Sequence, residues 1–147
     1  MTVLIIGAGL VGSQVAKILA DAGERPLVMD RHLQRDVVAK IVDLDKIDLI
    51  EGDVLRPLTL AAALARAKIT AIVHTAAYPL LTLGAQRNPY AALELNIMGL
   101  VNVMETARIH GIKRVVASSS STLNRYQSGG EDGGDMSKEE EIGRAHV

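Results

Sequence analysis

Residues 3–12 of the chain read Val3-Leu4-Ile5-Ile6-Gly7-Ala8-Gly9-Leu10-Val11-Gly12. A short apolar run, typical of a buried strand, leads into a G-x-G-x-x-G motif that opens a helix-period stretch. Glycines at this spacing allow a sharp turn, a close approach of backbone amides to a pyrophosphate, and tight packing of helix on sheet. The phosphates would lie at a helix N-terminus, where unpaired N–H groups favour negative charge. The stretch therefore predicts a nucleotide site at Gly7, Gly9, Leu10, Val11 and Gly12.

The alternative for an isolated glycine motif is an ordinary turn, and the next expected strand argues against it. That strand ends at Asp30, 18 residues after Gly12, close to where a carboxylate meets the ribose hydroxyls of adenosine. A carboxylate accepts hydrogen bonds from these hydroxyls and repels a 2′-phosphate, so Asp30 favours NAD over NADP. Arg31, directly after it, weakens that preference. We expect NAD as the cofactor and NADP as the less favoured one.

Composition narrows the class of protein. The chain has 147 residues, the size of one domain, and 48% of them are hydrophobic, enough for a core. It has no cysteine, so disulfides and thiolate metal sites are excluded, and no metal site is expected. A net charge of −1 without a basic block gives no reason to expect a nucleic-acid partner. No apolar run is long enough for a membrane helix and no basic leader is present, so a cytoplasmic protein is expected.

Short apolar runs alternate with helical patterns, as in βαβ units that build a parallel sheet covered on both faces. We expect strands near residues 2–6, 26–30, 47–51, 70–74 and 113–118. We expect helices near residues 11–22, 33–40, 57–67 and 89–110. Pro57 and Pro89 suit first helical positions, Asn88 suits an N-cap, and Gly111 ends the last helix. The pattern predicts an α/β fold with a Rossmann-type doubly wound sheet over residues 1–128.

The composition changes near the C-terminus. Residues 129–147 hold four glycines within six positions, six acids and two bases. Such a segment buries little apolar surface, so we expect a flexible tail. Residues 141–147 can also be back-translated into a sequence that reads like a common sequencing adapter. Roughly the last six or seven residues are therefore expected to be foreign to the natural protein.

Further motifs follow the later expected strands. They are Gly52-Asp53-Val54, Val73-His74-Thr75-Ala76-Ala77, Leu95-Asn96-Ile97-Met98-Gly99-Leu100, and Val115-Val116-Ala117-Ser118-Ser119-Ser120-Ser121. With them, about the first 141 residues resemble the extended short-chain dehydrogenase/reductase family, in its NAD-dependent epimerase/dehydratase group. The resemblance implies an oxidoreductase that passes hydride between nicotinamide and a small-molecule substrate, expected to be a nucleotide sugar. For the full-length protein it also implies a homodimer that pairs through the long helix at 89–110 and the catalytic helix beside it.

The resemblance assigns cofactor contacts to three of these motifs. Asp53 and Val54 would meet the adenine, although Asp53 could instead be a solvated acid at a strand end. The small residues Thr75 to Ala77 would let the backbone approach the nicotinamide ribose and the pyrophosphate, while His74 is assigned no chemistry. Asn96 would contact the cofactor or bridge to the active site, and a buried structural amide is the alternative.

The resemblance places the catalytic hydroxyl in the serine cluster. Ser120 matches the family pattern best, but strand alternation puts Ser118 on the same face, and a polar strand end without chemistry is the alternative. In the family this serine hydrogen-bonds the reacting substrate oxygen and helps to orient a tyrosine. That tyrosine exchanges the proton, and a lysine four residues later lowers its pKa.

Two departures from the family pattern matter. Ile6 stands where the family begins its phosphate loop with one more glycine. Tyr126 is the only tyrosine after the serines, and Gly130 stands where the lysine is needed. We therefore expect an N-terminal fragment, truncated after about the fifth strand, that binds the cofactor without turnover. The alternative function is a non-catalytic NAD(P)-binding regulatory module.

Overall fold

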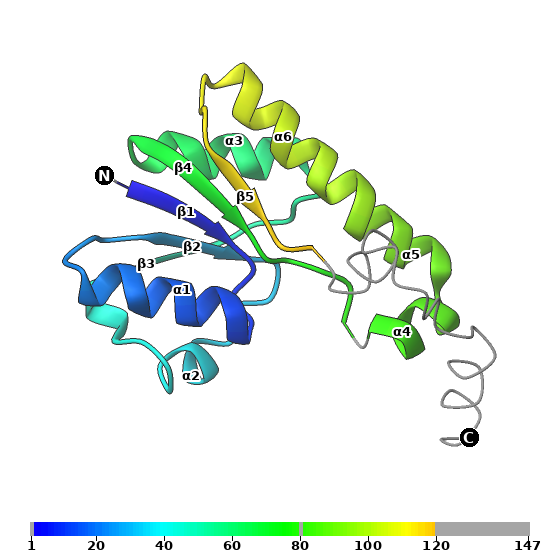
Figure 1. The fold of residues 1–147 in the computed structure, drawn as a ribbon, viewed down its shortest axis with the longest axis horizontal. Helices are drawn as coiled ribbons and strands as arrows, with labels where there is room; N and C mark the ends of the chain where they lie inside the picture. The colour runs from blue at the N-terminus through cyan, green and yellow to red at the C-terminus, as the bar shows by residue number, and fades with distance from the viewer. Residues whose placement is uncertain (1, 80, 120–147) are drawn as a thin grey trace, which may run out of the picture. The chain divides into compact units, whose positions relative to one another are not determined.

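The computed structural model describes residues 2–79 and 81–119. All helices and strands given below belong to one compact unit, residues 1–117. Its centre is a sheet of five parallel strands in the order β3-β2-β1-β4-β5 (Figure 1). The strands are β1 Thr2–Ile6, β2 Leu27–Asp30, β3 Asp48–Glu51, β4 Ile69–His74 and β5 Val115–Ala117.

Helical segments connect successive strands, which lets every strand run in the same direction. They are α1 Leu10–Asp21, α2 Arg35–Val38, the 3₁₀ turn η1 Leu44–Lys46, α3 Pro57–Arg66, α4 Leu81–Arg87, α5 Pro89–Leu93, the π-helical turn η2 Glu94–Met98 and α6 Gly99–Ile109. Among the described residues, no helix is long and apolar enough to cross a membrane.

β1 is the middle strand, and its alternating side chains supply both cores. Ile5 packs with Ala16 and Ala20 of α1 in one buried cluster. Leu4 and Ile6 belong to the opposite cluster, whose members include side chains of α3 and α6. Figure 1 shows α1 and α2 on one side of the sheet and α3 and α6 on the other. The predicted α/β fold with a doubly wound Rossmann-type sheet is confirmed.

The order of the strands creates a crevice at the edge of the sheet where the strands have their carboxyl ends. From β1 the chain builds outward through β2 and β3, then crosses back to place β4 on the other side of β1. The register pairs Leu4 of β1 with Leu27 of β2 and with Ile72 of β4. At such a reversal the loops at the carboxyl ends of the strands diverge and leave a crevice between them.

The structure differs from the sequence-based expectation in its helices. The helix expected at 33–40 is shorter, Arg35–Val38, and α4 was not anticipated. The helix expected at 89–110 begins as predicted, with the side chain of Asn88 accepting a hydrogen bond from Ala91 N, but the π-helical turn interrupts it. Gly111 follows its end with φ +68°, the left-handed conformation that glycine favours. The sequence pattern therefore located the helix and missed its irregular middle.

Candidate functional site

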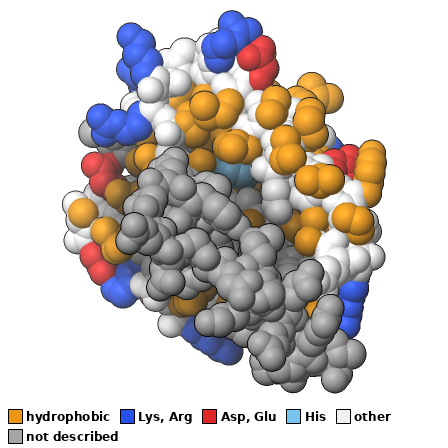
Figure 2. All heavy atoms as spheres, turned by 45° about the vertical axis from the view of Figure 1, so that its right-hand side comes forward, with side chains coloured by type: hydrophobic (Ala, Val, Ile, Leu, Met, Phe, Trp, Pro, Cys, Tyr) orange, Lys and Arg blue, Asp and Glu red, His pale blue; other side chains and the backbone are white. Residues whose placement is uncertain are grey.

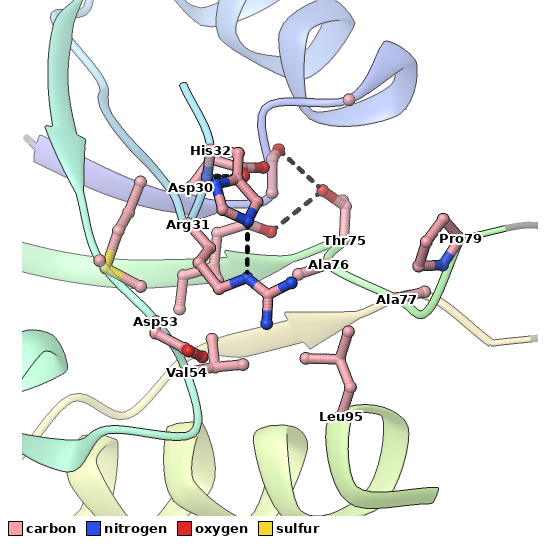
Figure 3. Close-up of a pocket in the computed structure, with 15 residues that line it drawn as sticks. Asp30, Arg31, His32, Asp53, Val54, Thr75, Ala76, Ala77, Pro79 and Leu95 are labelled. Atoms are coloured by element: carbon pink, nitrogen blue, oxygen red, sulfur yellow. Dashed lines mark hydrogen bonds between the residues drawn. The ribbon is translucent and has the colours of Figure 1, made fainter. Parts of the chain in front are cut away.

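A cavity of about 280 Å³ lies at the carboxyl ends of β1, β2 and β4 and beside the loop that follows β3 (Figure 3). Nine of the residues proposed from sequence line it: Gly7, Gly9, Asp30, Arg31, Asp53, Val54, Thr75, Ala76 and Ala77. Sequence reasoning missed six others: Ile6, Met29, His32, Gly52, Pro79 and Leu95. Most of these six directly precede or follow a predicted site residue. Their position in the loops at the strand ends was therefore the sequence signal that could have identified them.

Two of the motif glycines are required by packing. Gly7 has φ +105°, and a Cβ there would lie 2.7 Å from the backbone nitrogen of Ala76. A Cβ on Gly12 would lie 1.8 Å from the carbonyl oxygen of Gly7. These contacts bring the start of α1 against the strand-to-helix turn, as the motif predicted. Gly12 therefore shapes the loop from behind and does not line the cavity.

Gly9 has a different environment. It lines the cavity, and a Cβ built on it would have no described atom within 4 Å apart from those of its chain neighbours. It is also the N-cap of α1, where Ser13 N donates to its carbonyl oxygen over 2.9 Å. The amides of residues 10–12 therefore precede the first bond within the helix. An open position at a helix N-terminus has the shape and polarity that a phosphate group needs.

Leu10 and Val11 contribute to this position only through their backbone. Their side chains are 70% and 59% exposed, and neither residue lines the cavity. Behind them, the fully buried Ser13 donates its hydroxyl hydrogen to the carbonyl oxygen of Ala8 over 3.1 Å. This hydrogen bond holds the loop against the first turn of α1.

Asp30 fastens the glycine loop to the end of β2. Its Oδ2 accepts a hydrogen bond from Ala8 N at 2.7 Å, and its Oδ1 accepts one from His32 N at 2.9 Å. Each carboxylate oxygen has room for a second donor, so these bonds leave acceptor capacity for ligand hydroxyls. The residue predicted to bind ribose thus also positions the loop predicted to bind phosphate.

The loop after β3 is fixed by side chains on two helices. Thr59 Oγ1 of α3 accepts from Asp53 N at 3.0 Å and donates to Asp53 O at 2.8 Å, and Asp53 Oδ1 accepts from Leu55 N at 2.9 Å. Asn102 Nδ2 of α6 donates to Val54 O at 2.9 Å. A Cβ on Gly99 would lie 2.9 Å from Val54 Cγ2, so α6 approaches this loop closely.

The end of β4 is joined to the end of β1. The amides of Thr75 and Ala76 both donate to the carbonyl oxygen of Ile6, at 2.8 and 3.0 Å. The Thr75 hydroxyl lies 3.1 Å from the same oxygen and 3.2 Å from that of Gly7. Figure 3 shows both contacts. Small side chains at Ala76 and Ala77 leave the backbone accessible beside the cavity.

Asn96 lies outside the cavity lining. It is exposed on the π-helical turn, and its Oδ1 accepts a hydrogen bond from Tyr78 N at 2.8 Å. The side chain therefore joins this turn to the loop that continues from Thr75–Ala77. In this structure Asn96 holds a cavity loop from outside, and it is not the buried amide that was the alternative.

His74 is buried at the last position of β4, with 4% of its surface exposed. Its Nδ1 has no hydrogen-bond partner among the described residues. Burial lowers the pKa of its imidazole below the ordinary value, because the charged form loses its hydration. The residue is therefore neutral near pH 7.

Part of the predicted site cannot be placed. β5 ends at Ala117, and Ser118 and Ser119 follow it as exposed residues. Ser120, Ser121, Tyr126 and the predicted tail at 129–147 lie outside the described residues. Within the described part of the chain, no group of His, Asp and Glu side chains could hold a metal ion.

The parallel sheet and its glycine loop place the chain in the Rossmann-type class of α/β domains. Residues 3–142 match the model of the NAD dependent epimerase/dehydratase family, so the chain belongs to this family and the resemblance seen in its motifs is confirmed.

Proteins that are similar to this chain are named for different activities. The UDP-glucose 4-epimerase of Lacticaseibacillus casei is 31% identical over 121 residues, which cover 82% of this chain and 35% of that protein. The UDP-glucose 4-epimerase of Brucella ovis in complex with NAD superposes with a TM-score of 0.67 at 26% identity, over 82% of this chain and 36% of that one. A GalE-like L-threonine dehydrogenase from Cupriavidus necator superposes with a TM-score of 0.66 at 28% identity, over 78% and 35%. The chain thus spans about a third of the length of these relatives.

Proposed function

We propose that this chain binds NAD and forms the cofactor-holding N-terminal part of an oxidoreductase of the epimerase/dehydratase type. One observation carries the proposal: Gly9 leaves an open position at the N-terminus of α1, facing the cavity, while its neighbours Gly7 and Gly12 are closely packed. Family membership and the NAD complex of the Brucella ovis relative support the same cofactor.

Each part of the cavity has a role in this proposal. Gly9 and the first amides of α1 bind the pyrophosphate, and the carboxylate of Asp30 accepts hydrogen bonds from the ribose hydroxyls. Asp53 and Val54 contact the adenine, and Thr75 to Ala77 lie along the nicotinamide ribose. When bound, NAD supplies the hydride-accepting nicotinamide.

The chemical step belongs to the parent protein. We propose that Ser120 hydrogen-bonds the reacting substrate oxygen, and that the Tyr–Lys pair that exchanges the proton lies outside this chain. Because the similar proteins include both a UDP-glucose epimerase and a threonine dehydrogenase, the cofactor-holding part alone does not select the substrate. A nucleotide sugar is the proposed substrate, with the epimerase similarity as its support.

Titration of the 147-residue chain with NADH, followed by nicotinamide fluorescence, tests cofactor binding. We expect saturable binding by the wild type and roughly tenfold weaker binding by Gly9→Ala, because the added methyl group occupies the phosphate position. Gln14→Ala, on the exposed face of α1, is the matched control and should bind like the wild type. Equal binding by Gly9→Ala and the wild type would overturn the proposed phosphate position.

The gene region downstream separates the proposed enzyme part from the regulatory module, because neither function predicts turnover by the chain alone. The chain alone should bind NADH but should not interconvert UDP-glucose and UDP-galactose in the presence of NAD. The gene region downstream should then encode Tyr-x-x-x-Lys within a few dozen codons. A stop codon directly after Val147 would favour the non-catalytic module instead.

A further inference from the structure

Two side-chain hydroxyls hold consecutive carbonyl groups of the glycine loop. Ser13, in the first turn of α1, is fully buried and donates to the carbonyl oxygen of Ala8 over 3.1 Å. Thr75, directly after β4, is partly buried and has its Oγ1 3.2 Å from the carbonyl oxygen of Gly7 (Figure 3). The family resemblance gives neither hydroxyl a role, since it uses only the backbone at Thr75.

The Thr75 hydroxyl has one proton, and the neighbouring donors decide where that proton points. Thr75 Oγ1 also lies 3.1 Å from the carbonyl oxygen of Ile6. That oxygen already accepts the amides of Thr75 and Ala76, at 2.8 and 3.0 Å, so both of its lone pairs are used. The carbonyl oxygen of Gly7 accepts no other hydrogen bond from the described residues. The Thr75 hydroxyl therefore donates to Gly7.

These hydrogen bonds also fix the direction of the amides in the loop. In a trans peptide unit the C=O and the N–H point in opposite directions. The unit between Gly7 and Ala8 is held at both ends, because its oxygen accepts from Thr75 and its N–H donates to Asp30 Oδ2 at 2.7 Å. Thr75 and Asp30 thus hold one peptide plane from opposite sides.

The next peptide unit, between Ala8 and Gly9, is held only at its oxygen. Because Ser13 binds the Ala8 oxygen, the N–H of Gly9 points away from Ser13. This amide makes no hydrogen bond to another described residue, and Gly9 lines the cavity. If the unit rotated, the cavity would meet a carbonyl oxygen in place of an N–H, and an anion would lose a donor there. The direction of the Ala8 carbonyl therefore matters for anion binding.

We propose that Ser13 and Thr75 are positioning residues for phosphate binding, whose hydroxyls keep two consecutive loop carbonyls out of the cavity and the amide of Gly9 directed into it. This inference rests on the proposed dinucleotide site, and the part of the ligand concerned is the pyrophosphate. Each hydroxyl acts through the peptide unit that it binds. Gly12 leaves the room for one of them, since a Cβ there would lie 2.9 Å from Thr75 Oγ1.

Competition titrations against NADH test the proposal, because ADP carries a pyrophosphate and adenosine carries no phosphate. Ser13→Ala and Thr75→Val each remove one hydroxyl with little change in volume. Each variant should bind NADH and ADP about fivefold more weakly, the size of one lost neutral hydrogen bond, and should change adenosine binding by less than about twofold. Thr75→Ser keeps the hydroxyl, so it should bind all three ligands as the wild type does.

Each hydroxyl variant has a matched control outside the cavity lining. Thr70→Val makes the same change as Thr75→Val at an exposed residue of β4, whose hydroxyl lies 3.4 Å from the carbonyl oxygen of Thr2. Gln14→Ala, on the exposed face of α1, is the control for Ser13→Ala. Both controls should bind like the wild type. Circular dichroism checks the fold, and if Ser13→Ala does not fold, Thr75→Val against Thr75→Ser decides the proposal.

Amide hydrogen exchange of the chain without ligand gives a readout that does not depend on the cofactor. A loop carbonyl without its hydroxyl partner leaves the peptide unit freer to rotate and open. Exchange in residues 7–12 should therefore be faster in Ser13→Ala and Thr75→Val than in the wild type, and unchanged in Thr75→Ser and in both controls.

The outcomes separate this inference from the proposed function. If NADH binds the wild type, Ser13→Ala and Thr75→Val equally, the cofactor site stands and the role of the hydroxyls falls. An equal loss of ADP and adenosine binding would show that the hydroxyls support the whole cavity, and it would overturn the role in phosphate binding. Thr75→Ser that binds as weakly as Thr75→Val would exclude the hydroxyl as the cause. If the folded wild type binds neither NADH nor ADP, the proposed function fails and this inference fails with it.

Discussion

Asn102 donates a hydrogen bond from its Nδ2 to the carbonyl oxygen of Val54 over 2.9 Å, across 48 positions of sequence. The bond joins the middle of α6 to the loop after β3 that carries Asp53. Val54 itself is buried and belongs to the core shared with α3 and α6. α6 therefore helps to fix the loop after β3, although Asn102 itself does not line the cavity.

Asn102→Ala should lower stability and weaken dinucleotide binding together. Removing the donor leaves the carbonyl oxygen of Val54 without this partner, which costs about 1–2 kcal/mol. The freed loop then holds Asp53 less well, so the Kd for NADH should rise by a fewfold. Thermal unfolding and NADH titration measure the two effects, with Gln14→Ala as the control. Unchanged binding in a destabilised Asn102→Ala variant would show that the loop keeps its position without the bond.

The motif glycines should respond differently to the same methyl group. Gly12→Ala places a Cβ 1.8 Å from Gly7 O, so the start of α1 must move, and we expect a loss of roughly 3 kcal/mol or more. The Cβ of Gly9→Ala has no described atom within 4 Å apart from those of its chain neighbours, and a φ of −72° suits alanine, so the substitution should cost less than about 1 kcal/mol. Urea unfolding of both variants measures the difference. Similar losses would show that Gly9 is also a packing glycine.

His74 should make stability depend on pH below neutrality. Burial lowers the pKa of folded His74 below its ordinary value of 6.5. As pH falls through 6.5 the unfolded chain takes up a proton at this residue while the folded chain does not, so stability decreases by at most about 1.4 kcal/mol per pH unit. Above this range both states are neutral and the effect vanishes.

His74→Leu tests this dependence, because leucine removes both the proton site and the buried Nδ1, which has no hydrogen-bond partner in the described part of the chain. The variant should remain folded at pH 7.5 and lose part of the decrease in unfolding free energy between pH 7 and pH 5.5. Urea unfolding at several pH values provides the measurement. The same pH slope in the variant and the wild type would assign the dependence to other groups.

An apolar stripe along the last helical region predicts self-association. Leu93, Ile97, Val101 and Met104 recur at helical spacing and are each between 49% and 59% exposed. Figure 2, which turns the right-hand side of Figure 1 toward the viewer, shows hydrophobic side chains gathered on this face. Contact with a second copy would bury them. The family resemblance implies a homodimer of the full-length protein that uses this helix together with the catalytic helix.

The double variant Val101→Lys with Met104→Lys should shift the chain toward the monomer in sedimentation velocity. Charged side chains on the stripe would be costly to bury at an interface. Ile18→Lys, which changes an exposed residue of α1, serves as the control and should sediment like the wild type. A wild-type chain that remains monomeric at high concentration would refute the stripe as a contact between copies.

The sheet was predictable because its signals are local. Apolar runs mark each strand, and Gly7 to Gly12 specify the first turn, so strand positions and fold class follow from the sequence. The π-helical turn was not predictable, because one extra residue in a single turn changes the apolar spacing only locally, and the short pattern of residues 89–110 does not resolve that change.

The candidate site also has a part that the sequence predicts and a part that it does not. Residues next to strand ends, such as Asp30 and Thr75, were placed beside the cavity because parallel strands bring their carboxyl ends to one edge. Asn102 and His32 were missed, because their importance comes from a single hydrogen bond to a distant or neighbouring residue. Such bonds depend on side-chain direction, which composition and spacing do not reveal.

The hydrogen bond between Ala8 N and Asp30 gives this carboxylate a structural role at the edge of the cavity. A neutral apolar residue at position 30 would also release the turn before α1, because Ala8 N would lose its acceptor. Substitutions at positions 31 and 32 carry no such penalty, because both side chains are exposed. A change of charge at this edge of the cavity therefore disturbs the fold less at positions 31 and 32 than at position 30.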